Sequence, residues 1–209
     1  MKKLIWLEYM VSKQGLLLAG GFYVCFVVMA ILGERSNANW LYFLPSMISG
    51  LTLNRAITYF DRYDMDRVYI LLPIKISKTI GAKYIFHNTV LLVFSVIVCV
   101  TYVMTQYVGD YAGFNINFAL IYLGIGLVMV NAGLCGYYFL GAVDAQMIPV
   151  VIMLIVVCFL NQLMRVHVTM AMGVVTILIA MGISIILYLC ACVYVAANAI
   201  GRINIKRIP

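Results

Sequence analysis

The sequence feature that most constrains this chain is a series of apolar stretches about as long as a membrane is thick. A helix needs about 20 residues to cross the hydrocarbon core of a bilayer, and apolar stretches of this order recur between residues 16 and 200. Only 10% of the 209 residues are charged, whereas soluble domains carry roughly 25%. So few charges cannot form the surface of a water-soluble protein. We therefore predict an all-α integral membrane protein.

The apolar stretches predict six transmembrane helices in one domain that comprises residues 1–209. Residues 1–14 mix lysines with apolar and aromatic side chains, which is typical of a short helix lying in the membrane interface. Residues 61–83 form the longest hydrophilic connection, between the second and third spans. The expected spans are residues 16–33, 40–59, 84–106, 118–140, 147–163 and 170–200.

The positively charged residues predict the orientation of these helices, because Lys and Arg collect in the cytoplasmic loops of membrane proteins. With six spans and the N-terminus inside, 12 of the 14 Lys and Arg residues fall on the cytoplasmic side, and only Arg35 and Arg165 fall outside. We therefore expect both termini in the cytoplasm. The formal net charge of +7 then reflects loops that face anionic lipid, and we expect no nucleic-acid partner.

The sequence offers no set of side chains for catalysis or metal binding. Its two histidines, His87 and His167, belong to opposite ends of the predicted topology, so they cannot share a metal ion. The six cysteines lie in apolar stretches without the paired spacing of zinc sites, and we expect them to be small buried side chains. A glycine-rich phosphate loop is absent. We expect neither an enzyme nor a cofactor site in this chain. If ATP drives the protein, another chain must bind it.

Within the predicted spans, polar side chains are few and largely uncharged. Asn54 in the second span and Asn131 in the fourth would line a translocation path or hydrogen-bond to a neighbouring helix. Carriers driven by protons or ions normally keep an ionisable residue at depth. The near absence of charge in the spans therefore argues against an ion-coupled carrier and favours a path for amphipathic or hydrophobic cargo.

The connection between the second and third spans is the one loop with marked chemical content. Acidic and basic residues alternate from Asp61 to Arg67, and Pro73 then ends any preceding helix. Two short elements divided by a proline and joined directly to two transmembrane helices favour a rigid contact with a soluble partner. A solvated loop that merely follows the positive-inside rule is the alternative interpretation.

Two motifs in this connection carry a family resemblance. Leu72-Pro73-Ile74 and, at matching spacing, Ala82-Lys83-Tyr84 resemble the bacterial ABC-2 type permease family, which commonly has a Leu-Pro pair followed by Ala/Ser-Lys-Tyr at the start of the third span. The sequence departs from that pattern at residues 75–78, where the family more often has Ser, Arg, Lys and Glu. The interfacial helix, the six spans and the charged first cytoplasmic loop extend the similarity over the whole chain.

This resemblance implies a permease subunit of an exporter in the bacterial cell membrane. Two permease subunits, identical or different, would pair with two copies of an ABC ATPase, which would bind the ATP and Mg²⁺. The cargo would be an amphipathic or hydrophobic peptide, drug or lipid-like molecule. On this resemblance, the loop 61–83 couples the permease to the ATPase. The residues expected to make or shape that contact are Asp61, Asp64, Asp66, Arg67, Pro73, Lys75 and Lys78.

A second function from a different class stays open at this stage. The same loop would also suit a membrane anchor or immunity protein that binds a cytoplasmic partner without transporting anything. ATP hydrolysis that depends on this chain would distinguish the permease from the anchor.

Overall fold

The computed structural model describes residues 2–32, 38–63, 75–108, 115–163 and 170–205, and nearly all of them are helical. No strand occurs in these ranges. The all-α prediction is therefore confirmed. The elements are α1 (Lys2–Leu32), the 3₁₀ helix η1 (Ala38–Phe43), α2 (Leu44–Arg62), α4 (Ile76–Val108), α5 (Ile116–Leu140), α6 (Ala142–Leu163) and α7 (Met170–Ile205).

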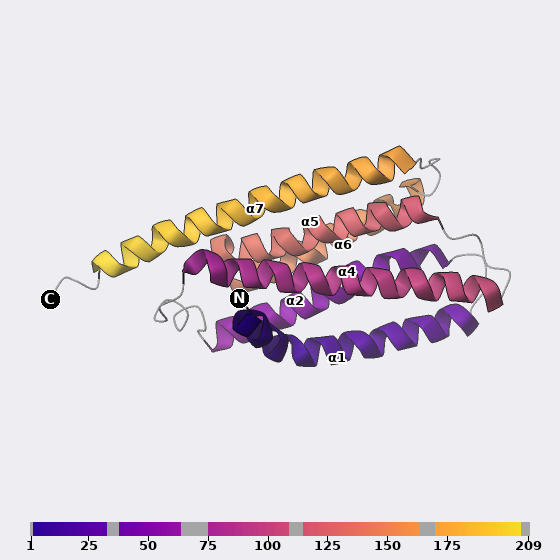
Figure 1. The fold of residues 1–209 in the computed structure, drawn as a ribbon, viewed down its shortest axis with the longest axis horizontal. Coiled ribbons are helices and arrows are strands. Elements are labelled where there is room, and N and C mark those ends of the chain that lie inside the picture. The colour runs from indigo at the N-terminus through magenta and orange to yellow at the C-terminus, as the bar shows by residue number, and fades with distance from the viewer. Residues whose placement is uncertain (1, 33–37, 64–74, 109–114, 164–169, 206–209) are drawn as a thin grey trace.

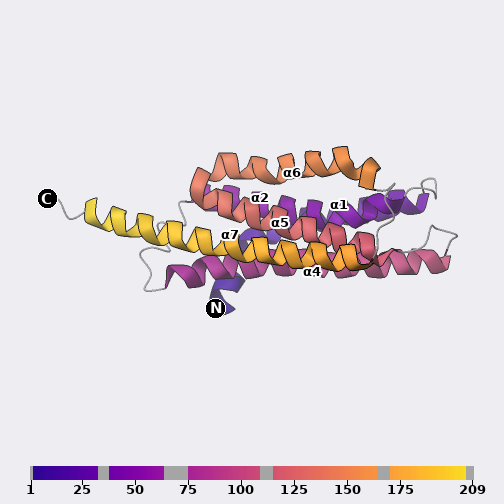
Figure 2. The same cartoon turned by 90° about the horizontal axis from the view of Figure 1, so that it is seen from above.

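The α-helices run up and down an elongated bundle (Figure 1). One end of the bundle holds the first turns of α1, α4 and α6 and the last turns of α2, α5 and α7 (Figure 1). Helix α1 ends at the opposite end. We call the end that holds the first turns of α1 the terminal end. Helix α5 contacts α2, α4, α6 and α7, so it forms the centre around which the others pack. Figure 2 shows α6 and α7 on different sides of α5.

Three of the described helices contain a segment that is long and apolar enough to cross a bilayer. These segments are Ser77–Met104 in α4, Ile116–Leu140 in α5 and Met172–Asn198 in α7. Long apolar helices with many exposed apolar side chains are stable only where lipid replaces water. The prediction of a helical membrane protein is thus confirmed.

The N-terminal helix differs from the two separate segments predicted at 1–14 and 16–33. Helix α1 is continuous from Lys2 to Leu32, and its first turns lie across the bundle before the helix turns along it (Figure 2). Its inner face buries Glu8 at 1% and Ser12 at 0% exposure, and Leu4, Leu7 and Val11 pack against the core. A helix that only rests on the membrane surface would not bury these polar groups.

Two other boundaries lie earlier in the chain than predicted. Helix α4 begins at Ile76 instead of 84, so the C-terminal part of the predicted loop 61–83 is helical. Helix α6 begins at Ala142 instead of 147, because Gly141 makes the turn after α5 by itself with a φ of 91°. Asp144 consequently lies in the first turn of α6, where a carboxylate complements the helix dipole.

Close packing of α2 and α4 on α5 depends on a glycine. A Cβ atom at Gly126 would lie 2.7 Å from Ser46 Oγ of α2 and 2.9 Å from Leu91 Cδ1 of α4. Both distances are shorter than a normal van der Waals contact. The absence of a side chain at Gly126 therefore lets three helices meet at one level, as small residues commonly do between membrane helices.

The cysteines follow the sequence expectation only in part. Cys135 is buried, Cys99 and Cys192 are partly buried, and Cys25 and Cys190 are exposed; Cys158 lies outside the described side chains. The prediction of burial is wrong for Cys25 and Cys190, because the outer face of a membrane helix meets lipid and accepts a small apolar side chain as readily as the core does.

Candidate functional site

The ends of α2 and α4 bring the described part of the predicted coupling loop to the terminal end of the bundle. Asp61 is exposed in the last turn of α2. Lys75 and Lys78 are exposed at the start of α4. The other predicted contact residues, Asp64, Asp66, Arg67 and Pro73, lie outside the described residues. The two ends of the loop thus present exposed charges of both signs at the terminal end of the bundle.

The last residues of the predicted loop are not part of an exposed connection. Ala82, Lys83 and Tyr84 belong to α4 and are 1%, 1% and 5% exposed. Lys83 and Glu8, which lie outside the predicted spans, are therefore charged residues that the fold buries. One turn after Lys83, the buried His87 has an Nδ1 atom without a hydrogen-bond partner among the described residues.

Aromatic rings surround the ammonium group of Lys83. Its Nζ lies 3.8 Å from the ring centroid of Phe60, 5.0 Å from that of Tyr137 and 5.4 Å from that of Tyr138. A cation within about 6 Å of an aromatic face is attracted by the ring quadrupole, most strongly where water is excluded. Phe60 belongs to α2 and both tyrosines to α5. We call Phe60, Tyr137 and Tyr138 the aromatic cage of Lys83.

A second polar cluster joins α4, α5 and α7. Asn131 is fully buried, and its side chain exchanges two hydrogen bonds of 3.1 Å with that of Asn88. Its Nδ2 also donates to Ser184 Oγ at 2.9 Å and to the Leu127 carbonyl at 2.7 Å. We call Asn88, Asn131 and Ser184 the asparagine cluster. Its side chains satisfy one another, so in this conformation Asn131 acts in helix packing.

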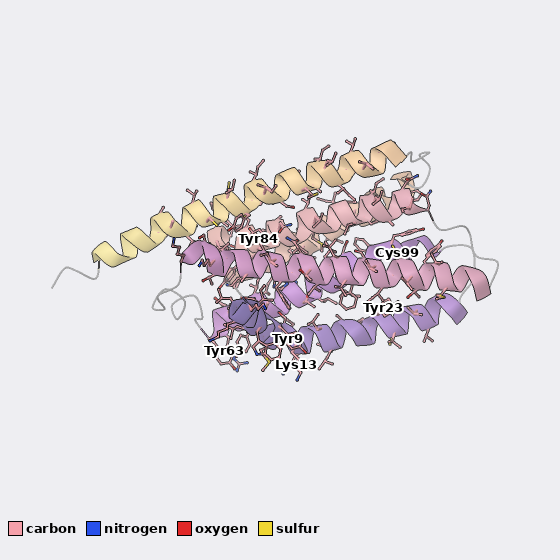
Figure 3. The ribbon with its side chains drawn as sticks, in the orientation of Figure 1. Tyr9, Lys13, Tyr23, Tyr63, Tyr84 and Cys99 are labelled. Atoms are coloured by element: carbon pink, nitrogen blue, oxygen red, sulfur yellow. The ribbon has the colours of Figure 1, made fainter. Side chains whose placement is uncertain are left out.

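Tyr84 extends this contact towards the terminal end. Its hydroxyl donates towards the backbone carbonyls of Asn131 and Leu187, at 3.5 and 3.4 Å. Figure 3 shows Tyr84 in the half of the bundle that also holds Tyr9 and Tyr63, whereas Tyr23 and Cys99 lie nearer the other end. One stretch of α4 therefore contacts both groups: Lys83 on one face meets the cage, and Asn88 on the neighbouring face belongs to the asparagine cluster.

Asn54, the other predicted path residue, does not join the asparagine cluster. Its side chain is partly buried on α2, and its Oδ1 has no hydrogen-bond partner among the described residues. Its backbone carbonyl accepts a bond of 2.8 Å from Thr58 Oγ1. The described hydrogen bonds therefore do not join Asn54 to Asn131.

An apolar groove of about 300 Å³ lies between α6 and α7, with α5 as its floor. Gly124, Thr176 and Ala180 are the small residues of its lining. The one polar group among them, Thr176 Oγ1, donates to the Met172 carbonyl at 2.8 Å. The groove is thus lined almost entirely by hydrocarbon.

A comparison with protein families gives one match that covers almost the whole chain. The sequence profile described as ABC-2 family transporter protein matches residues 3–202. The chain belongs to the ABC-2 transporter family. It is therefore a multi-pass membrane permease of an ABC transporter, a component that associates with an ABC ATPase. Neither the curated proteins nor the solved structures that were compared give a match.

Sequence reasoning missed Lys83, His87 and Asn88 as interior residues of this ABC-2 permease. The spacing carries a signal for Lys83 and His87, because residues four apart lie on the same face of a helix, whereas Asn88 lies on the neighbouring face. The buried Ala82-Lys83-Tyr84 motif thus lies where α4 packs against α2 and α5.

Proposed function

We propose that this chain is the membrane-spanning half of an exporter that moves an amphipathic or hydrophobic molecule out of the cell. Six spans with both termini in the cytoplasm form the subunit, and two such subunits work with two ATPase subunits that bind ATP and Mg²⁺. The match to the ABC-2 transporter family over residues 3–202 is the observation that carries this proposal.

The distribution of charge supports the orientation. Lys2, Lys3, Lys75 and Lys78 are exposed at the terminal end, and the two residues expected outside, Arg35 and Arg165, belong to connections at the opposite end of the predicted topology. Cytoplasmic loops hold such an excess of positive side chains. The terminal end is therefore the cytoplasmic end, where an ATPase is available.

The apolar character of the interior supports the cargo class. The groove between α6 and α7 exposes hydrocarbon, and the asparagine cluster satisfies its own hydrogen bonds. A hydrophilic cargo would need free polar groups along its path. An amphipathic or hydrophobic cargo needs few of them, because it travels in contact with apolar side chains.

Labelling of single cysteines tests the proposed orientation. In a cysteine-free variant, a membrane-impermeant thiol reagent added to intact cells is expected to modify Ser36→Cys, Asp110→Cys and Arg165→Cys. Lys75→Cys is the control and is expected to react only after the membrane is opened, because it lies at the cytoplasmic end. Modification of Lys75→Cys in intact cells, or protection of all three outer positions, contradicts the orientation.

Reconstitution with its partner ABC ATPase tests the function. Hydrolysis of ATP is expected to rise when the permease is present. Replacing Asp61, Asp64 and Asp66 together by asparagine is expected to lower this stimulation on the order of tenfold, the effect of losing about 1.4 kcal/mol of contact energy.

Asp144→Asn is the matched control, since Asp144 is an exposed carboxylate at the same end of the bundle but outside the loop. It is expected to leave the stimulation unchanged. A rate of ATP hydrolysis that the wild-type permease does not change refutes the proposed function. Equal effects of the triple variant and the control contradict the assignment of the contact to residues 61–83.

A further inference from the structure

The aromatic cage of Lys83 connects the helices from which the proposed coupling loop departs. Phe60 directly precedes Asp61 at the end of α2, and Lys83 lies on α4 shortly after the exposed Lys75 and Lys78. The connection between α2 and α4 thus begins shortly after Phe60 of the cage. It ends a few residues before Lys83, the residue that the cage surrounds. Tyr137 and Tyr138 add the terminal end of α5 to the same contact.

A buried ammonium group makes this contact sensitive to the positions of the helices. Lys83 is 1% exposed, and a charge in this environment is stable only while compensating groups surround it. The attraction between a cation and a ring weakens as the cation leaves the ring face. Sliding α4 along α2 or α5 would therefore move the charge away from rings that water cannot replace. An apolar side chain of the same length would tolerate such sliding better.

We propose that Lys83 is a positioning residue for coupling: through its aromatic cage, it fixes α4 to α2 and α5, so that a push on the loop 61–83 moves the three helices as one body. This inference rests on the proposed function, because it assumes an ATPase that pushes. Lys83 itself contacts neither the ATPase nor the cargo in this role. The asparagine cluster continues the same connection from α4 and α5 to α7.

Progressive fluorination of Phe60 separates attraction to a cation from packing. One, two or three fluorine atoms withdraw electron density from the ring face and change the ring volume little, so they weaken the attraction to Lys83 in steps. Phe43 receives the same series as the control, because it is buried at 8% exposure and packs against Tyr122, away from the cage. All variants are made in the full chain and reconstituted with the ATPase in liposomes.

Two measurements are made on each variant. Spin labels at Tyr63→Cys and Ser77→Cys in a cysteine-free background report the distance between the ends of α2 and α4 without nucleotide. We expect its distribution to broaden with each fluorine at Phe60. The stimulation of ATP hydrolysis is expected to fall stepwise, by on the order of tenfold for three fluorines, with unchanged ATPase retention. Lys83→Met is expected to match the trifluorinated protein, and Lys83→Arg to retain most of the stimulation.

The possible outcomes are distinct. Equal behaviour of all fluorinated Phe60 variants, or an equal response of the Phe43 series, overturns the role of the cage. Broader distances with unchanged stimulation also overturn it, because the joint would then not serve coupling. An unmodified complex in which the permease does not affect hydrolysis refutes the proposed function instead, while the distance distributions still show whether the cage joins the helices.

Discussion

Replacing Phe60 by leucine is expected to lower the free energy of unfolding by about 3 kcal/mol. The change nearly conserves volume, which by itself costs less than about 1.5 kcal/mol in a core. It also removes the ring whose centroid lies 3.8 Å from Lys83 Nζ, and a desolvated contact between a cation and a ring is worth about 2 kcal/mol. Unfolding by SDS in mixed micelles measures the difference.

A double-mutant cycle assigns this loss to the pair. In the K83M background, Phe60→Leu is expected to cost only about 1 kcal/mol, the packing part of the effect. The difference between the two backgrounds is the interaction between Lys83 and Phe60. An equal cost of Phe60→Leu in both backgrounds would show that the ring contributes packing alone.

Replacing Asn131 by aspartate is expected to destabilise the protein by about 3 kcal/mol, although the two side chains have nearly the same shape. In the wild-type protein, Nδ2 of Asn131 donates to Asn88 Oδ1, Ser184 Oγ and the Leu127 carbonyl. A carboxylate oxygen at this place would face two carbonyl-type acceptors. A charged aspartate near the middle of a membrane helix costs about 2.5–3.5 kcal/mol on insertion scales.

Asn131→Leu is the control for this prediction. It removes the hydrogen bonds without adding a charge, and interhelical hydrogen bonds in membranes average about 0.6 kcal/mol. We therefore expect a loss of about 1–2 kcal/mol, because more than one bond is broken. Thermal unfolding monitored by circular dichroism compares the variants. A leucine variant less stable than the aspartate variant would contradict the account given for the cluster.

The class of fold was predictable from the sequence because it depends on local composition. Apolar stretches fixed the existence of the long helices, and the expected range 118–140 nearly coincides with α5, Ile116–Leu140. The start of α6 was harder to predict, since a single residue, Gly141, makes the turn between the expected spans 118–140 and 147–163. A tight turn made by one glycine leaves little compositional signal.

The interior of the candidate site was not predictable for a different reason. Lys83 was expected at the end of a loop, because lysine ordinarily marks the edge of a span. The rings of Phe60, Tyr137 and Tyr138 that lie around its ammonium group are distant from it in sequence and meet only through the fold. Asn131 was recognised as a polar residue in a span, but its partner Asn88 depends on the packing of α4 against α5.

The position of α7 at the edge of the bundle has a practical consequence for handling the protein. Only 11% of the apolar segment Met172–Asn198 is buried, although this helix contacts α5 along much of its length. The surrounding amphiphile therefore solvates most of α7, and the docking of the last helix depends on which amphiphile is chosen. Short-chain detergents cover such a long apolar surface poorly, so the subunit is expected to be less stable in them than in a bilayer. Extraction in lipid discs, which retain the native bilayer, preserves the complete subunit.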